Sequence, residues 1–147
     1  MLHLASMMAL PVIYSVYVGL AEQGRTLALA AAARRRDDSA MPLLVGELDN
    51  QLAIARLALD QMVRIAAERA PSPETTNEVL ICRTLVGQAS ARAIEKALEV
   101  AGGVGFYRSF GLERLFRDVQ AARYHPLQEK AQLTYSGRLA LGLDIDA

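Results

Sequence analysis

The apolar residues of this chain recur every three or four positions, through long stretches separated by short polar breaks. In the second such stretch they form one stripe: Leu44, Leu48, Leu52, Ala55 and Leu59. This spacing places apolar side chains on a single face of an α-helix. No segment alternates apolar and polar residues as a half-buried strand does. The pattern therefore predicts an all-α fold.

Prolines, glycines and charged clusters mark the ends of the predicted helices. We expect helices over about 10–35, 42–69, 73–101, 112–123 and 127–141. Pro11 should lie in the first turn of the first helix, where proline is tolerated. Short connections force neighbouring helices to run antiparallel. The sequence thus predicts an up-and-down bundle of three long helices, closed by a shorter C-terminal helical pair, in one domain over residues 1–147.

The third helix should carry the apolar face and end at a cluster of glycines. Its predicted apolar face consists of Val79, Leu80, Leu85, Ala89, Ala93 and Leu98. Glycine commonly ends a helix because it adopts backbone conformations that other residues avoid. Gly102, Gly103 and Gly105 are therefore the predicted stop.

Charge and composition limit the classes of partner. Sixteen basic and sixteen acidic residues balance to a formal charge of zero, which gives no electrostatic reason to expect a nucleic acid. The single cysteine, Cys82, excludes an internal disulfide and a cysteine-based zinc site, and it is expected in the core. His3 has no partner at metal-ligand spacing, so no metal site is expected.

Residues 1–21 contain no charged side chain, and an uncharged apolar run of this length can cross a bilayer. Against a span, Pro11 and several serines and tyrosines interrupt the run, and no basic residue precedes it. The helical pattern also continues into a charged segment. We expect a buried bundle helix here, with no membrane span, in a cytoplasmic protein.

The segment 101–126 holds most of the candidate functional residues. Consecutive glycines expose backbone amides with no Cβ in front of them, so a turn at Gly102 and Gly103 can receive a phosphate or a carbonyl-rich ring. The same residues serve equally well as a simple helix end. Glu113 and Arg117 are spaced to form a surface ion pair on a helix.

Together these residues resemble a known family. Gly102-Gly103-Val104-Gly105-Phe106, followed by Glu113-Arg114 and Arg117-Asp118, resembles the C-terminal signature of the acyl-CoA dehydrogenases. The stretches VYVGLAEQGRTLALAAAARR and GELDNQLAIARLAL are similar to earlier parts of the same domain. The resemblance implies a helical domain that contacts FAD and neighbouring subunits, in a flavoprotein that oxidises the Cα–Cβ bond of acyl-CoA thioesters. The family's N-terminal helical and middle β-domains are absent from these 147 residues.

The resemblance also assigns candidate site residues. Glu99, where the family often has glutamine, and the glycines Gly102 and Gly103 are the implied cofactor contacts. Arg34, Arg35 and Arg36 could supply phosphate contacts, although a solvated helix end is the expected role. Pro126 falls where the family usually has its catalytic glutamate, and residues 1–21, from which other members take their base, contain no carboxylate. No catalytic residue is therefore expected, and this chain alone should be inactive.

Two alternatives stay open beside that interpretation. His125, next to Pro126, resembles the flavin monooxygenase branch of the fold, in which a histidine can assist by moving protons. Otherwise His125 is a partly buried residue at a helix boundary set by the proline. The second alternative is a non-catalytic assembly module, because an exposed apolar face of the bundle can drive the formation of a homo-oligomer.

Overall fold

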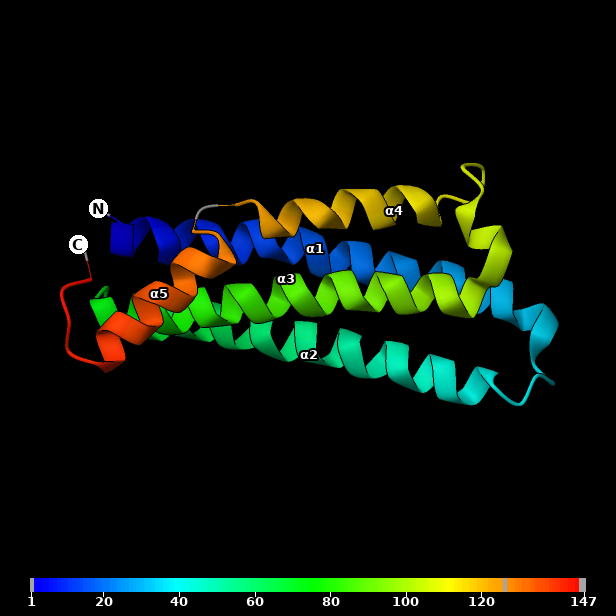
Figure 1. The fold of residues 1–147 in the computed structure, drawn as a ribbon, viewed down its shortest axis with the longest axis horizontal. Coiled ribbons are helices and arrows are strands. Elements are labelled where there is room, and N and C mark those ends of the chain that lie inside the picture. The colour runs from blue at the N-terminus through cyan, green and yellow to red at the C-terminus, as the bar shows by residue number, and fades with distance from the viewer. Residues whose placement is uncertain (1, 126, 146–147) are drawn as a thin grey trace.

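The computed structural model describes residues 2–125 and 127–145. Three long helices lie side by side: α1 (Leu2–Ala32), α2 (Met41–Glu68) and α3 (Pro73–Ala101) (Figure 1). The shorter α4 (Leu112–Val119) runs back along α1 and α3, and α5 (Glu129–Ala140) crosses the beginning of α3. Short 3-10 turns extend α1, α3 and α4: Ala33–Arg35, Gly102–Phe106 and Gln120–Arg123. The described residues contain no strand, so the predicted all-α bundle is confirmed.

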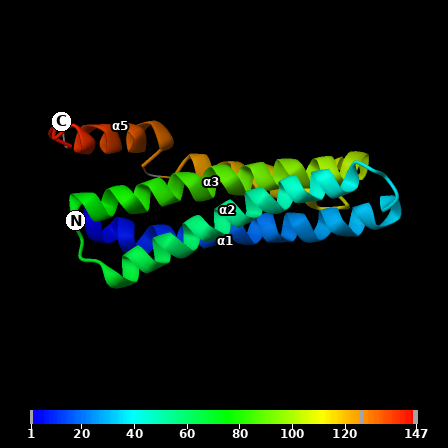
Figure 2. The ribbon, with the colours of Figure 1, turned by 90° about the horizontal axis from the view of Figure 1, so that it is seen from below.

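Helix α3 is the centre of the fold, because α1, α2, α4 and α5 all pack against it (Figures 1 and 2). Small residues allow these close approaches. A Cβ added at Gly24 of α1 would lie 3.3 Å from Ile94 of α3, and one added at Gly87 of α3 would lie 3.4 Å from the ring of Tyr14. The hydroxyl of Ser72 caps the start of α3 by accepting the Thr75 amide at 3.1 Å.

The first helix begins earlier than the sequence predicted. Helix α1 starts at Leu2, not near residue 10, and Pro11 lies inside it. The loss of one backbone hydrogen bond at Pro11 is offset because the preceding turns bury Ser6, Met7 and Leu10 in the bundle. A hydrogen bond of 2.8 Å also joins Nδ1 of His3 and the hydroxyl of Thr76.

The predicted burial of one residue of the α3 face is wrong. Leu85 is 43% exposed, whereas the other five members of the predicted α3 face are buried. Leu85 lines a surface groove of about 650 Å³, together with Ile54 of α2. Helix α3 is covered from several directions, so a single apolar stripe does not describe which of its sides faces a gap.

Polar side chains hold α5 against α3. The hydroxyl of Thr84 donates to Gln132 at 2.8 Å, and Gln132 donates to Ser136 at 2.7 Å. Ser136 in turn donates to Asn77 at 2.5 Å. This network fixes the chain that follows residue 126.

The outward face of α1 is apolar along its first four turns. Leu4, Met8, Val12 and Val16 recur every four residues and are 59–70% exposed. By length and composition alone, α1 meets the criteria for a membrane-spanning helix, which core helices of bundles also meet; 39% of its most apolar window is buried inside the bundle. The exposed stripe is therefore an apolar surface that the bundle itself leaves uncovered.

Candidate functional site

The glycine turn after α3 forms a surface groove. Gly102 ends α3 with a φ of +66°, a conformation that favours glycine. Here the groove has a volume of about 460 Å³ and is lined by Glu95, Leu98, Glu99, Gly102, Gly103, Phe106 and Phe116. The three residues that the resemblance assigned to the cofactor thus lie together in one groove.

The groove has apolar walls and an acidic rim. Phe106 is 67% exposed, and no atom lies within 4 Å of the position that a Cβ on Gly103 would take. Lys96 pairs with Glu99 at 2.9 Å and with Glu47 at 2.9 Å. A groove with two phenylalanines and bare glycine backbone in its lining suits a flat aromatic ring. A phosphate fits less well, because the lining residues include no cation, and the two acidic ones, Glu95 and Glu99, already pair with Arg92 and Lys96.

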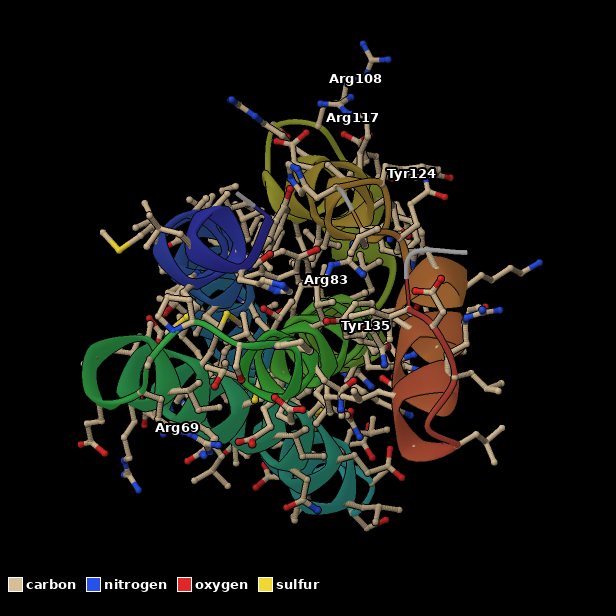
Figure 3. The ribbon with its side chains drawn as sticks, turned by 90° about the vertical axis from the view of Figure 1, so that its left-hand side faces the viewer. Arg69, Arg83, Arg108, Arg117, Tyr124 and Tyr135 are labelled. Carbon is tan, nitrogen blue, oxygen red and sulfur yellow. The ribbon has the colours of Figure 1, made fainter. Side chains whose placement is uncertain are left out.

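The arginines at the end of α1 lie close to this turn. A Cβ on Gly102 would be 3.0 Å from a guanidinium nitrogen of Arg35, which also pairs with Asp38 at 2.9 Å. Arg34 and Arg36 are exposed. Farther along, Glu113 and Arg117 form the predicted ion pair, at 3.5 Å. In Figure 3, Arg108 and Arg117 point away from the bundle.

A second cluster joins α1 to the segment after α4. The ring nitrogen Nε2 of half-buried His125 is hydrogen-bonded to the hydroxyl of Tyr17. The two rings lie 5.6 Å apart between centroids, and Tyr14 lies 6.0 Å from the same imidazole. Pro126 lies outside the described residues. The first helix and the residue before Pro126, the two regions where the resemblance allows a catalytic base, therefore meet through a tyrosine and a histidine.

Burial sets the protonation of the two tyrosines. Tyr14 is fully buried and donates its hydroxyl to the carbonyl of Ala122 at 2.7 Å. Desolvation raises the pKa of Tyr14 to about 12, against the lowering effect of the nearby Arg83 guanidinium. Desolvation also raises the pKa of Tyr17 above its ordinary value. Both phenols are therefore protonated at neutral pH, so Tyr17 has a proton that it can donate to His125.

The sequence interpretation missed Tyr14, Tyr17 and Arg83. Arg83 is 2% exposed and lies inside the bundle among α1, α3 and the segment after α4 (Figure 3). A signal was available, because a lone arginine interrupts the apolar run of α3, and two tyrosines stand three residues apart on α1. Neither pattern indicates a site until the return of the chain along α4 brings them together.

Cysteine and metal chemistry have little support in the described residues. Cys82 is buried as expected, and desolvation raises the pKa of its thiol. Within residues 2–125 and 127–145, no three His, Cys, Asp or Glu side chains gather closely enough to hold a metal ion.

Comparison with known proteins places this arrangement in a family. Residues 13–129 match the family described as acyl-CoA dehydrogenase, C-terminal domain. The chain is 25% identical over 126 residues to the putative acyl-CoA dehydrogenase YdbM of Bacillus subtilis (80% of this chain, 33% of YdbM). It is 30% identical over 139 residues to the amino sugar nitrososynthase DnmZ of Streptomyces peucetius (86% of this chain, 34% of DnmZ).

Solved structures share the fold. KijD3 in complex with dTDP aligns with a TM-score of 0.78 and 26% identity, over 90% of this chain and 37% of KijD3. KijD3 in complex with FMN and a dTDP-linked amino-keto sugar aligns with a TM-score of 0.83 and 24% identity, over 96% of this chain and 38% of that one. The chain spans about a third of the length of the curated relatives it matches. With four-fifths of its residues inside the family match, the chain belongs to the acyl-CoA dehydrogenase C-terminal domain family, a helical domain of flavin-dependent oxidoreductases.

Proposed function

We propose that this chain is the helical domain of a flavin-dependent monooxygenase, rather than of an acyl-CoA dehydrogenase. The observation that carries the proposal is the Tyr17–His125 pair at the meeting point of α1 and the segment after α4. Dehydrogenation of an acyl-CoA needs a carboxylate to take the α-proton, and here a phenol and an imidazole stand instead. The 30% identity to a nitrososynthase supports the same choice.

In this proposal the chain contributes a proton-handling group. A bound reduced flavin supplies the activation of oxygen. The hydroxyl of Tyr17 and Nε2 of His125 are hydrogen-bonded, and we infer that the phenol is the donor, which places the proton of the neutral imidazole on Nδ1. An imidazole held in one tautomer can give or take a proton near neutral pH. The chain's own role is then to hold that proton at a fixed atom.

The glycine groove is the proposed contact for another part of a flavin. Gly102 lies fifteen residues beyond Gly87, which packs on Tyr14, and this corresponds to about 22 Å along α3. One flavin ring therefore does not contact both His125 and the groove. Since the groove favours a ring over a phosphate, we assign it to the adenine of FAD, from the same or a neighbouring subunit.

Flavin titration tests the cofactor assignment. Quenching of flavin fluorescence is the readout, with the unmodified chain as the reference. Gly103→Leu fills the groove without a backbone clash, and Gly46→Leu, also at an open glycine, is the matched control. We expect FAD to bind more tightly than FMN, and Gly103→Leu alone to weaken FAD binding. Equal binding of FAD by both variants and the unmodified chain would refute the groove assignment.

Oxygen uptake tests the reaction class. With chemically reduced flavin, the full-length flavoprotein that contains this domain should consume oxygen faster than free flavin does, and His125→Ala in that protein should remove the increase. With oxidised FAD, an artificial electron acceptor and a panel of acyl-CoA thioesters, no turnover is expected. Acyl-CoA oxidation by the chain, or oxygen uptake unaffected by His125→Ala, would reject the monooxygenase assignment.

Assembly is a second proposed role, supported by the exposed stripe of Leu4, Met8, Val12 and Val16 on α1. A continuous apolar surface of this kind on a soluble domain commonly marks a contact with other polypeptide. We propose that the bundle forms a homo-oligomer through this stripe. Because no charged residue occurs before Glu22, two copies of the stripe can meet without repulsion between like charges.

A further inference from the structure

Arg83 is a buried cation without an acidic partner. It is 2% exposed, and none of the ion pairs among the described residues includes it. One terminal guanidinium nitrogen donates to the carbonyl of His125 at 2.8 Å and to that of Ala122 at 3.3 Å. The guanidinium carbon lies 5.3 Å from the centre of the Tyr14 ring, and Nε has no hydrogen-bond partner.

These contacts explain how the charge is tolerated. The carbonyls of Ala122 and His125 lie at the end of α4 and the 3-10 turn Gln120–Arg123 that extends it, where backbone dipoles leave partial negative charge. The face of the Tyr14 ring adds a cation–π interaction. A buried charge held only by dipoles is a costly way to stabilise a fold. The arrangement therefore calls for another reason to place a guanidinium at this point.

That reason is found in His125. Its backbone carbonyl is held by Arg83, while its ring nitrogen Nε2 is held by Tyr17. The adjoining carbonyl of Ala122 is held by both Tyr14 and Arg83. The backbone and the ring of His125 are thus fixed from two different helices, α3 and α1. If the hydrogen bond from Arg83 or the one with Tyr17 is lost, His125 is fixed by only one of the two helices.

We propose that Arg83 is a positioning residue that fixes the imidazole of His125 against Tyr17, and so selects the ring atom that carries the proton. The inference rests on the proposed function, in which His125 moves that proton. Arg83 acts through the backbone, because its hydrogen bond to His125 is made to the carbonyl oxygen. The side chain on α3 therefore sets the geometry of a residue 42 positions later in the chain.

Nuclear magnetic resonance of the flavin-free chain tests this directly. The chain has only two histidines, so a His3→Gln background leaves the ring of His125 as the single imidazole signal. At about pH 8.5, above the ordinary histidine range, ¹⁵N ring correlations identify which nitrogen carries the proton. We expect one Nδ1–H tautomer and a nuclear Overhauser contact with the ring of Tyr17.

The variants separate position from charge and from folding. Arg83→Gln keeps a donor but shortens its reach, and we expect a mixture of both tautomers and loss of the contact with Tyr17. Arg92→Gln, at an exposed arginine of the same helix, should leave both signals unchanged. Should Arg83→Gln fail to fold, Arg83→Lys is measured instead, and it should show a weakened contact with the same tautomer as the major form.

Retention of the single tautomer and the full Tyr17 contact in a folded Arg83 variant would overturn the proposal. Because these signals are read without flavin, they are independent of the flavin titration and of oxygen uptake. A chain that binds no flavin but shows the expected change in His125 would refute the proposed function and leave the positioning role intact. Normal flavin binding with unchanged His125 signals would do the reverse.

Discussion

Tyr14→Phe should change how the stability of the bundle depends on alkaline pH. The hydroxyl is fully buried, and its pKa is raised to about 12, from an ordinary value of 10.0. Between these values the unfolded chain has lost the phenolic proton while the folded chain keeps it, so stability falls as pH rises. At pH 11 the linkage amounts to about 1.4 kcal/mol, and it approaches about 2.7 kcal/mol above pH 12.

The measurement compares two unfolding curves at two pH values. At pH 8, loss of the hydrogen bond to the Ala122 carbonyl should cost the variant about 1 kcal/mol, because Arg83 still serves that carbonyl. At pH 11 only the unmodified chain is destabilised by ionisation of this phenol in the unfolded state. The difference in unfolding free energy between the two proteins should therefore close or reverse. Guanidinium unfolding followed by circular dichroism gives both differences. A gap that stays constant from pH 8 to pH 11 would refute the claim that Tyr14 remains protonated inside the fold.

Two further substitutions test other parts of the fold. Ser72→Ala removes the hydroxyl that accepts the Thr75 amide, so the free energy of unfolding should fall by about 1 kcal/mol, as measured by the same denaturation. Val12→Glu, in the middle of the α1 stripe, should reduce the mass found by light scattering to that of one chain, while Leu57→Glu on α2, at nearly equal exposure, should not. Assembly through α1 would be contradicted if the unmodified chain is already monomeric at high concentration. It would also be contradicted if the two substitutions have equal effects.

Helix periodicity gave most of the fold because it depends on neighbours in the chain. The ends of α2 and α3 fall within one residue of their predicted positions, since Pro42, Ser72 and Gly102 act through local backbone geometry. The early start of α1 and the exposure of Leu85 were not predictable in this way. Both depend on which sides of a helix other helices cover, and that information is not contained in a single periodic stripe.

The two candidate sites differ in the same way in how far the sequence predicts them. All but one of the residues lining the glycine groove lie between 95 and 106, so the motif there locates it, and only Phe116 comes from α4. The histidine cluster joins Tyr17 to His125, residues separated by 108 positions. The sequence supplied His125 as one open alternative through a resemblance, but Arg83 and the tyrosines needed the three-dimensional return of the chain.

That return depends on matched helix lengths. Leu112 lies against the region of α3 near Ala97, and Ala122 lies beside Gly87. Ten residues of α4 and its 3-10 turn cover about 16 Å, and ten residues of α3 cover about 15 Å. The two antiparallel segments therefore have matching lengths. His125 lies beside Tyr17 because of this match.

An insertion in α4 tests whether the match in length builds the site. One alanine added after Arg117 turns every later residue by about 100°, which removes Ala122 from the core and should destabilise the bundle by several kcal/mol. Four alanines restore the facing to within about 40° but move His125 by about 6 Å. We expect the second variant to fold, by circular dichroism, and to lose the nuclear Overhauser contact between His125 and Tyr17. If this contact is kept in the four-alanine variant, local interactions around His125, and not helix register, position the imidazole.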